Sequence, residues 1–360
     1  MIERLIALIV AIITIIIYAF QCFIREGGNG TYSGGGSNST RRPRSKARGG
    51  QSLVSGEIEP IHQCRILTFN IEYEATNYSP KDIVEIFNSV GADTVILNEA
   101  HGEENRQKVS MLPTKLTATL ASNGLNYVFT HDWAIVASKH PLSQPHKGSR
   151  NKYLDSATLV NGKYYVITVH LTDYPYQPFQ LAKIPYCYNE CQKNICRECP
   201  KAEEEMISAA TAARGSDVDL IIAAINTLRY KEKSTLPVII AGDFNEPSHL
   251  DWTESAVKAG IHPLKVAFPT SSRLQSEGIV DLYRVVHPDP IANPGYTWPA
   301  RQLTVEELRD LSKGQINSAI STPADRIDYI YGTGVRPIRA EVLQTPSDHN
   351  AVMIDIITRL

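Results

Sequence analysis

Carboxylate, amide and imidazole side chains follow several short apolar runs of the sequence. The set comprises Asn70 after ILTF, Glu99 after VILN, His170 after YVITV, Asp243 and Asn245 after VIIAG, Asp328 within RIDYIY, and Asp348 with His349 just before the last apolar run. Carboxylate and amide oxygens suit Mg²⁺ or Mn²⁺, and an imidazole beside a carboxylate can carry a proton or hold an anion. Taken singly, each residue also has a structural explanation, since Asp and Asn commonly cap turns.

The apolar runs predict β-strands that alternate with helices. The strand candidates are residues 66–71, 94–97, 134–137, 164–169, 238–241, 327–330 and 351–357. Ser79 and Pro80 predict a helix start that extends to about residue 90, and residues 202–230 predict one or two helices around Gly215. One α/β domain over residues 60–360 accounts for this pattern, and active sites of α/β folds collect at strand ends.

Taken together, these residues resemble the endonuclease/exonuclease/phosphatase superfamily, the metal-dependent phosphodiesterase fold of pancreatic-type deoxyribonucleases, abasic-site endonucleases, neutral sphingomyelinases and inositol polyphosphate phosphatases. The most specific motifs are GDFN at 242–245, DRIDY at 325–329 and SDH at 347–349, with support from Thr297 and Trp298. The segments GDFNEPSHLDWT and PGYTWP resemble a poorly characterised branch of that superfamily. The resemblance covers about residues 65–357 and implies a four-layered α/β sandwich, with two sheets face to face and helices outside.

The resemblance also implies a metal centre. By family match, Glu99 would be the main ligand of Mg²⁺ or Mn²⁺, with Asn70 and Asp348 nearby. Asn98 stands before Glu99 where the family more often has Gln, and Glu72 stands where nuclease branches often have Asp. Neither departure removes the catalytic set.

The remaining roles implied by the resemblance concern water and phosphate. Asp243 would position and deprotonate the attacking water, and Asn245 would donate a hydrogen bond to the phosphate or orient that water. Asp328 would fix the tautomer of His349, and the pair would hold the phosphate or assist the water. His170 would complete the cradle for the anion.

A cysteine-rich insertion is predicted at about residues 172–200. Cys187, Cys191, Cys196 and Cys199 could bind Zn²⁺, form two disulfides in a secretory lumen, or remain free thiols. At the start of the insertion, three aromatic side chains could contact the leaving group or pack the insertion against the body: Tyr174, Tyr176 and Phe179.

The N-terminal region predicts attachment to a lipid bilayer. Residues 5–24 are twenty residues without a charge, which is long enough for a single transmembrane helix, and residues 25–59 form a flexible Gly/Ser- and Arg-rich linker. The basic residues after this segment favour a cytoplasmic catalytic domain. Glycosylation sequons at Asn29 and Asn38 favour the lumen, so the two signals conflict.

Composition bounds the function further. The chain has 36 basic and 38 acidic residues; residues 1–50 hold seven of the former and two of the latter, so the body carries a net charge of −7. An acidic body lacks the broad basic field that gathers long nucleic acids and favours a compact substrate. The leading interpretation is a membrane-anchored Mg²⁺-dependent phosphodiesterase or nuclease. The alternatives are a lipid or inositol-phosphate phosphodiesterase or phosphatase, and a non-catalytic tethered binding protein; the sequence indicates no protein partner.

Overall fold

The computed structural model describes residues 62–72, 79–100, 114–131, 134–182, 200–301, 304, 306 and 324–358. The predicted anchor at 5–24, the linker at 25–59 and the four clustered cysteines lie outside these residues, so they remain predictions. Within the described part of the chain, no helix combines the length and the apolar character needed to cross a membrane.

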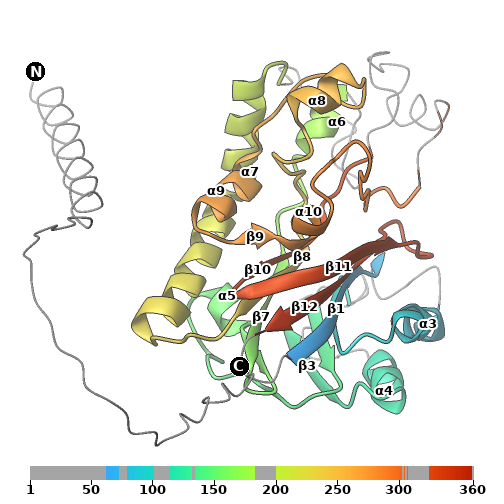
Figure 1. Ribbon diagram of the computed structural model, residues 1–360, viewed down its shortest axis with the longest axis vertical. Coiled ribbons are helices and arrows are strands. Elements are labelled where there is room, and N and C mark those ends of the chain that lie inside the picture. Colours follow the sequence, from blue (N-terminus) through green and yellow to red (C-terminus); the bar gives the residue numbers. More distant parts are fainter. Residues whose placement is uncertain are drawn as a thin grey trace, which may run out of the picture. The chain divides into compact units, whose positions relative to one another are not determined.

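Twelve strands of the described residues form two six-stranded sheets (Figure 1). Sheet A has the spatial order β11 (Val335–Leu343), β12 (Ala351–Thr358), β1 (His62–Asn70), β2 (Thr94–Asn98), β4 (Ala134–Ser138) and β3 (Tyr127–His131). Sheet B has the order β5 (Leu142–Ser143), β6 (Thr158–Val160), β7 (Tyr164–His170), β8 (Val238–Asp243), β10 (Asp328–Thr333) and β9 (Val280–Asp281). Both sheets are mixed: β1 and β2 run parallel, as do β7 and β8, while the other pairs are antiparallel.

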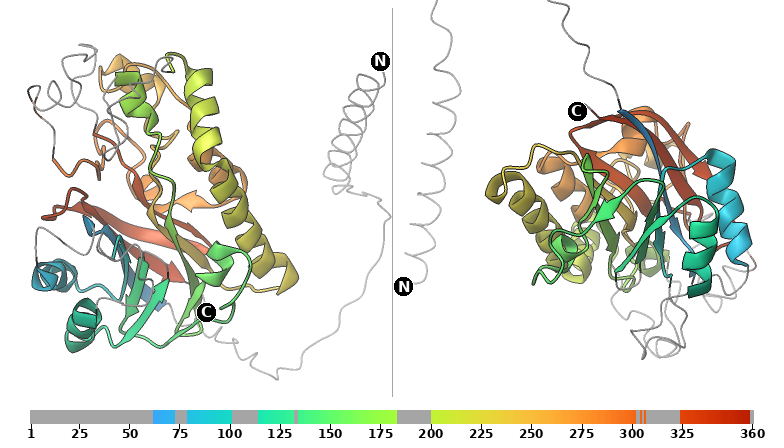
Figure 2. Two further views of the ribbon diagram at one scale, coloured as in Figure 1. Left: turned by 180° about the vertical axis from the view of Figure 1, so that it is seen from behind. Right: turned by 90° about the horizontal axis from the view of Figure 1, so that it is seen from below.

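Helices cover the outer face of each sheet (Figure 2). Sheet A packs against α3 (Pro80–Val90) and α4 (Thr114–Ser122). Sheet B packs against α7 (Glu203–Asn226), α5 (Lys152–Asp155) and α9 (Pro269–Ser276), and the shorter helices α6 (Gln177–Ala182), α8 (Glu254–Lys258) and α10 (Leu282–Val286) complete the set. This arrangement confirms the predicted α/β sandwich with two packed sheets flanked by helices.

Alternation along β1 shows why the central strands are apolar on both faces. Ile66 belongs to the core between the two sheets, whereas Leu67 and Phe69 belong to the core under α3 and α4. Successive side chains of a strand point to opposite faces, so a strand with both faces buried is a continuous apolar run. All seven predicted strands overlap observed strands for this reason.

The two helical regions predicted from the sequence differ in how well they match the structure. The predicted start of α3 is confirmed: the Asp82 carboxylate accepts a hydrogen bond of 2.6 Å from the Ser79 N–H, Pro80 occupies the first turn, and Gly91 ends the helix at φ 68°. The second region, predicted to form one or two helices, is a single helix α7 that continues through Gly215 into one π-helical turn. Burial of one side of α7 against sheet B outweighs the roughly 1 kcal/mol cost of a helical glycine.

Strand β11 was not predicted from the sequence. It contains Pro337 and several charged residues, and among the described strands it pairs with β12 alone, with a register shift between Pro337 and Arg339. Such features belong to an edge strand with a bulge, whose polar side chains give no apolar run.

Candidate functional site

Three strand ends of sheet B lie side by side and present the central residues of the site. His170 on β7 is in register with Asp243 on β8, and Asp243 is in register with Asp328 on β10. Residues paired in register on neighbouring strands share a face of the sheet. The sheet ladder therefore forms a row of imidazole and two carboxylates from positions up to 158 residues apart in the sequence.

Asn70, at the end of β1, joins sheet A to this row. Its side-chain amide donates hydrogen bonds of 3.0 Å to both Glu99 Oε1 and Asp243 Oδ2. Its oxygen accepts the backbone N–H of Glu72 at 3.1 Å, which fixes the direction of the amide. Asn70 thus links Glu99, the predicted main metal ligand, to Asp243, the predicted base.

A second amide, Asn98, links the two sheets beside Gly242. Asn98 Nδ2 donates to Val169 O at 2.8 Å, and the backbone N–H of Asp243 donates to Asn98 Oδ1 at 3.1 Å. Gly242 has φ 141°, and a Cβ there would lie 2.0 Å from Val169 O. Only glycine fits at this position, because a Cβ would clash with the backbone of the adjacent strand β7 in the same sheet and would lie 2.8 Å from Asn98 Oδ1 of sheet A. The bridging role of Asn98 had no signal in the sequence beyond its place before Glu99.

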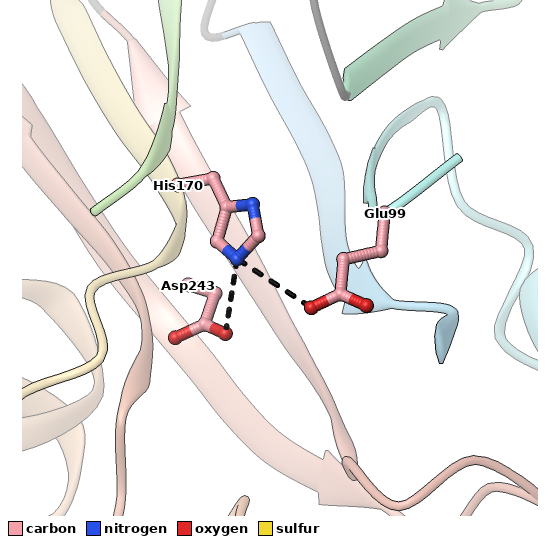
Figure 3. A group of neighbouring side chains, drawn as sticks. All are labelled: Glu99, His170 and Asp243. Atoms are coloured by element: carbon pink, nitrogen blue, oxygen red, sulfur yellow. Dashed lines mark ion pairs between the residues drawn. The ribbon is translucent and has the colours of Figure 1, made fainter. Parts of the chain in front are cut away.

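Glu99, His170 and Asp243 form the first of two overlapping clusters (Figure 3). His170 Nε2 lies 3.5 Å from Glu99 Oε1 and 3.8 Å from Asp243 Oδ2. One ligand atom from each of the three side chains lies within 4.8 Å of the others. Glu99 and His170 are partly exposed while Asp243 is buried, so a ligand that enters this edge meets Glu99 and His170 first.

Asp243, Asp328 and His349 form the second cluster. His349 Nδ1 donates to Asp328 Oδ2 at 2.8 Å, and His349 Nε2 lies 3.8 Å from Asp243 Oδ2. Burial opposes the charge on this imidazole, but Asp328, Asp348 and Asp243 outweigh burial and raise the pKa of His349 to about 10. His349 is therefore a cation at neutral pH, held with one ring nitrogen toward Asp243.

Asp243 differs from an ordinary carboxylate. Burial, and after it the negative charge of Asp328, raises the pKa of Asp243 to about 6, against the opposing effect of His349 and His170. Its Oδ1 accepts the backbone N–H of Asn245 at 2.8 Å. A carboxylate with a pKa close to neutrality can accept a proton from water more effectively than an ordinary aspartate.

Thr297 positions Asp328 from a third segment. Its hydroxyl accepts the backbone N–H groups of Ile327 and Asp328 at 2.9 and 3.0 Å. Thr297 belongs to a motif that supported the family resemblance, yet sequence reasoning gave it no role. Asp328 Oδ1 is buried and has no hydrogen-bond partner among the described residues.

Asn245 and Asp348 differ in how closely they join the clusters. Asn245, at φ 51°, adjoins Asp243 and donates its side-chain amide to Leu171 O at 3.0 Å. Asp348 is exposed, and its carboxylate accepts the Trp298 indole N–H and the Ser347 hydroxyl, both at 3.2 Å. It lines a cavity of about 550 Å³ and, although it adjoins His349, it is not a member of either cluster of potential ligands among the described residues. Its predicted role in metal binding stays a prediction.

The aromatic residues after His170 divide by exposure. Tyr176 and Phe179 are only 2% and 4% exposed, so they pack inside the body, whereas Tyr174 is 41% exposed. For Tyr176 and Phe179 the structure supports the packing interpretation over direct contact with a leaving group.

The chain belongs to the endonuclease/exonuclease/phosphatase family, whose sequence profile matches residues 67–349. An uncharacterized protein of Caenorhabditis elegans is 25% identical over 275 residues, which span 75% of this chain and 78% of that protein. Two solved structures are similar at low identity. An AP endonuclease from Archaeoglobus fulgidus is 15% identical (81% of this chain, 98% of that chain, TM-score 0.48), and an endonuclease/exonuclease/phosphatase from Beutenbergia cavernae is 16% identical (82% and 71%, TM-score 0.43). The family membership confirms the resemblance and indicates a hydrolase of the phosphodiesterase, nuclease or phosphatase type.

Proposed function

We propose that this protein is a Mg²⁺- or Mn²⁺-dependent phosphodiesterase that acts on nucleic acid or nucleotide substrates. The observation that carries the proposal is the environment of Asp243 Oδ2, which lies 3.8 Å from the Nε2 atoms of both His170 and His349 and next to the Glu99 cluster. Phosphodiester hydrolysis needs a proton acceptor for water and positive charge around the phosphate. The two overlapping clusters supply both at one sheet edge.

The residues present fit a divalent cation. Glu99 and Asp243 offer carboxylate oxygens beside His170, and the buried Asp328 Oδ1 lacks a hydrogen-bond partner among the described residues. Hard cations select such oxygen donors. A bound Mg²⁺ or Mn²⁺ would neutralise charge on the phosphate oxygens, and Glu99 would be the main residue that holds it.

Side chains of the protein itself accept the proton and contact the phosphate. Asp243 accepts a proton from the attacking water. Asp328 holds the His349 imidazole by its Nδ1 atom, so the charged Nε2–H is available to the phosphate. His170 adds a second nitrogen donor on the other side of Asp243, and Asn245 fixes Asp243 through its backbone N–H.

Replacing Glu99 by glutamine is expected to raise the Mg²⁺ concentration that gives half-maximal activity, because an uncharged amide binds a hard cation more weakly than a carboxylate. The fold should persist, since Gln retains an oxygen that can accept the Asn70 amide. Isothermal titration of Mg²⁺ into both proteins measures the affinity without an activity assay. Glu254→Gln, on an exposed pair with Lys258, is the matched control. Identical Mg²⁺ responses of the parent and Glu99→Gln would show that Glu99 is not a ligand.

A substrate panel tests the proposed activity itself. The full chain is assayed with Mg²⁺ and with chelator on a bis-aryl phosphate, plasmid DNA, RNA, sphingomyelin and inositol polyphosphates. We expect chelator-sensitive hydrolysis of the bis-aryl phosphate and of at least one nucleic acid. Hydrolysis of only the lipid or the inositol phosphates would favour the alternative substrate class, and hydrolysis of nothing would favour a binding protein on this fold.

Membrane attachment is a separate part of the proposal and is supported by the uncharged run at residues 5–24 alone. Alkaline carbonate extraction of cell membranes should leave the full chain in the pellet and release a chain that lacks residues 1–52. Release of both chains would refute the anchor while leaving the proposed hydrolysis untouched.

A further inference from the structure

Arg214, in the middle of α7, is fully buried and bonds to residues Asp173–Gln177, which lead from the end of β7 into the start of α6. Its side chain is 0% exposed. The guanidinium donates to Gln177 Oε1 at 2.9 Å, to Asp173 O at 3.3 Å and to Pro175 O at 3.1 Å. One planar fork therefore satisfies three acceptors in the five residues Asp173 to Gln177.

The counter-charge of Arg214 is Glu246, which is also buried. Arg214 Nη1 lies 3.8 Å from Glu246 Oε2, and Glu246 Oε1 accepts the backbone N–H of Thr270 at 2.8 Å. Burial of two charges is costly, and well-packed apolar residues often replace such a pair without loss of stability. The carbonyls of Asp173 and Pro175 are a better explanation for the arginine, because partly buried carbonyl groups outside regular structure need donors.

The chain that leads into Asp173–Gln177 starts at the sheet edge that carries His170 and Asp243. Leu171 follows His170, donates its backbone N–H to Asp243 O at 3.0 Å, and accepts the Asn245 side chain. The strand end and the GDFN turn therefore fix this segment at its start. Beyond Leu171, Arg214 bonds to the carbonyls of Asp173 and Pro175, and Gln177 Nε2 also donates to Pro175 O at 2.8 Å.

The far end of the same segment supports Trp298. The rings of Tyr176 and Phe179 lie 5.3 and 5.2 Å from the Trp298 ring, and the Tyr176 hydroxyl donates to Asp325 Oδ2 at 2.6 Å. Trp298 in turn lies 6.2 Å from the His349 ring, and its indole N–H donates to Asp348. Arg214 is thus connected to the His349 imidazole by a chain of contacts that runs through residues Asp173–Gln177 and the Trp298 indole.

We propose that Arg214 is a positioning residue: it holds the segment Asp173–Gln177 so that Tyr176 and Phe179 support Trp298 beside His349. Arg214 touches neither substrate nor reacting atoms in this role. Its effect on turnover rests on the proposed hydrolytic function, whereas its effect on Trp298 does not. Loss of the guanidinium fork should therefore change the surroundings of the indole and lower kcat more than it changes KM.

Two variants separate positioning from charge. Arg214→Lys keeps a positive charge opposite Glu246 but loses the planar fork. The double variant Arg214→Met/Glu246→Gln removes both charges and avoids an unpaired buried carboxylate. We expect kcat for a bis-aryl phosphate to fall roughly 10–100-fold in both variants with KM nearly unchanged, as for a small displacement remote from the reacting atoms.

A spectroscopic measurement on the full chain does not depend on activity. Incorporation of 5-fluorotryptophan gives one ¹⁹F signal for each of the three tryptophans, and Trp298→Phe identifies the signal of Trp298. This signal should shift in both Arg214 variants. Arg65→Lys is the matched control, since Arg65 also makes a fork to a carboxylate, Asp355, and donates to a carbonyl, Val90 O.

Arg65→Lys should lower the thermal unfolding midpoint without a change in the Trp298 signal or in kcat. An unchanged Trp298 signal in both Arg214 variants would overturn the proposal. So would an equal shift of that signal in Arg65→Lys, because the effect would then be general destabilisation. If the parent hydrolyses no phosphate ester, the proposed function fails, and the ¹⁹F signal still decides whether Arg214 positions Trp298.

Discussion

Replacing His349 by alanine or Asp328 by asparagine is expected to lower kcat by roughly 10²–10⁴, the range for loss of a proton-transfer or charge-stabilising group. The cation that His349 presents depends on Asp328, whose Oδ2 accepts its Nδ1–H at 2.8 Å. Without the carboxylate the imidazole loses both its orientation and much of its charge. Because the two residues act as one unit, the double variant should be little worse than the more damaging single variant.

Steady-state kinetics of the three variants at saturating Mg²⁺ check this result, with Asp219→Asn, an exposed carboxylate paired with Arg273, as the control. Fully additive losses would refute the pairing. NMR titration of the His349 ring should give a pKa near 10 in the parent and a lower value in Asp328→Asn. Since the folded pKa lies above the unfolded value of 6.5, this group's contribution to stability is complete below pH 6.5 and is lost as pH rises through about 10.

Replacing Asp243 by asparagine is expected to lower kcat by a similar factor of roughly 10²–10⁴. Asparagine cannot accept a proton from water at neutral pH. The parent's activity should rise with pH through a limb near pH 6 if the metal-free pKa persists in the working enzyme, and a metal that binds Asp243 would move the limb to lower pH. An Asp243→Asn variant with parental kcat would exclude Asp243 as the proton acceptor.

Although Asp243→Asn should lower kcat, it should raise the stability of the folded protein when chelator is present. The folded pKa of Asp243, about 6, lies above the ordinary value of 3.8, so protonation favours the folded state. This contribution is present below pH 3.8 and is lost as pH rises through about 6, by up to about 3 kcal/mol. Denaturant unfolding should therefore show Asp243→Asn gaining stability relative to the parent between pH 4 and pH 8. A constant difference over that range would contradict the raised pKa.

The central strands could be predicted because their physics is local. Residues 94–97 and 238–241 are apolar runs with both faces buried, and such runs are recognisable without knowledge of their neighbours. The edge strand β11 could not be predicted, because its pairing with β12 is a tertiary contact that its own polar sequence does not require. The long helix α7 likewise owes its continuity through Gly215 to burial against sheet B, which no local pattern encodes.

The sequence by itself determined which chemical groups this protein carries and that they follow strand ends: Asn70, Glu99, His170, Asp243, Asn245, Asp328 and His349. The identities of these residues and their order in the chain were sufficient to identify the family. Only the tertiary structure decided their relations, because registers between distant strands place His170, Asp243 and Asp328 in one row. It also directed the Asp348 carboxylate to the Trp298 indole. The pKa values of Asp243 and His349 depend on burial and on charges far apart in the sequence, so no local pattern could have supplied them.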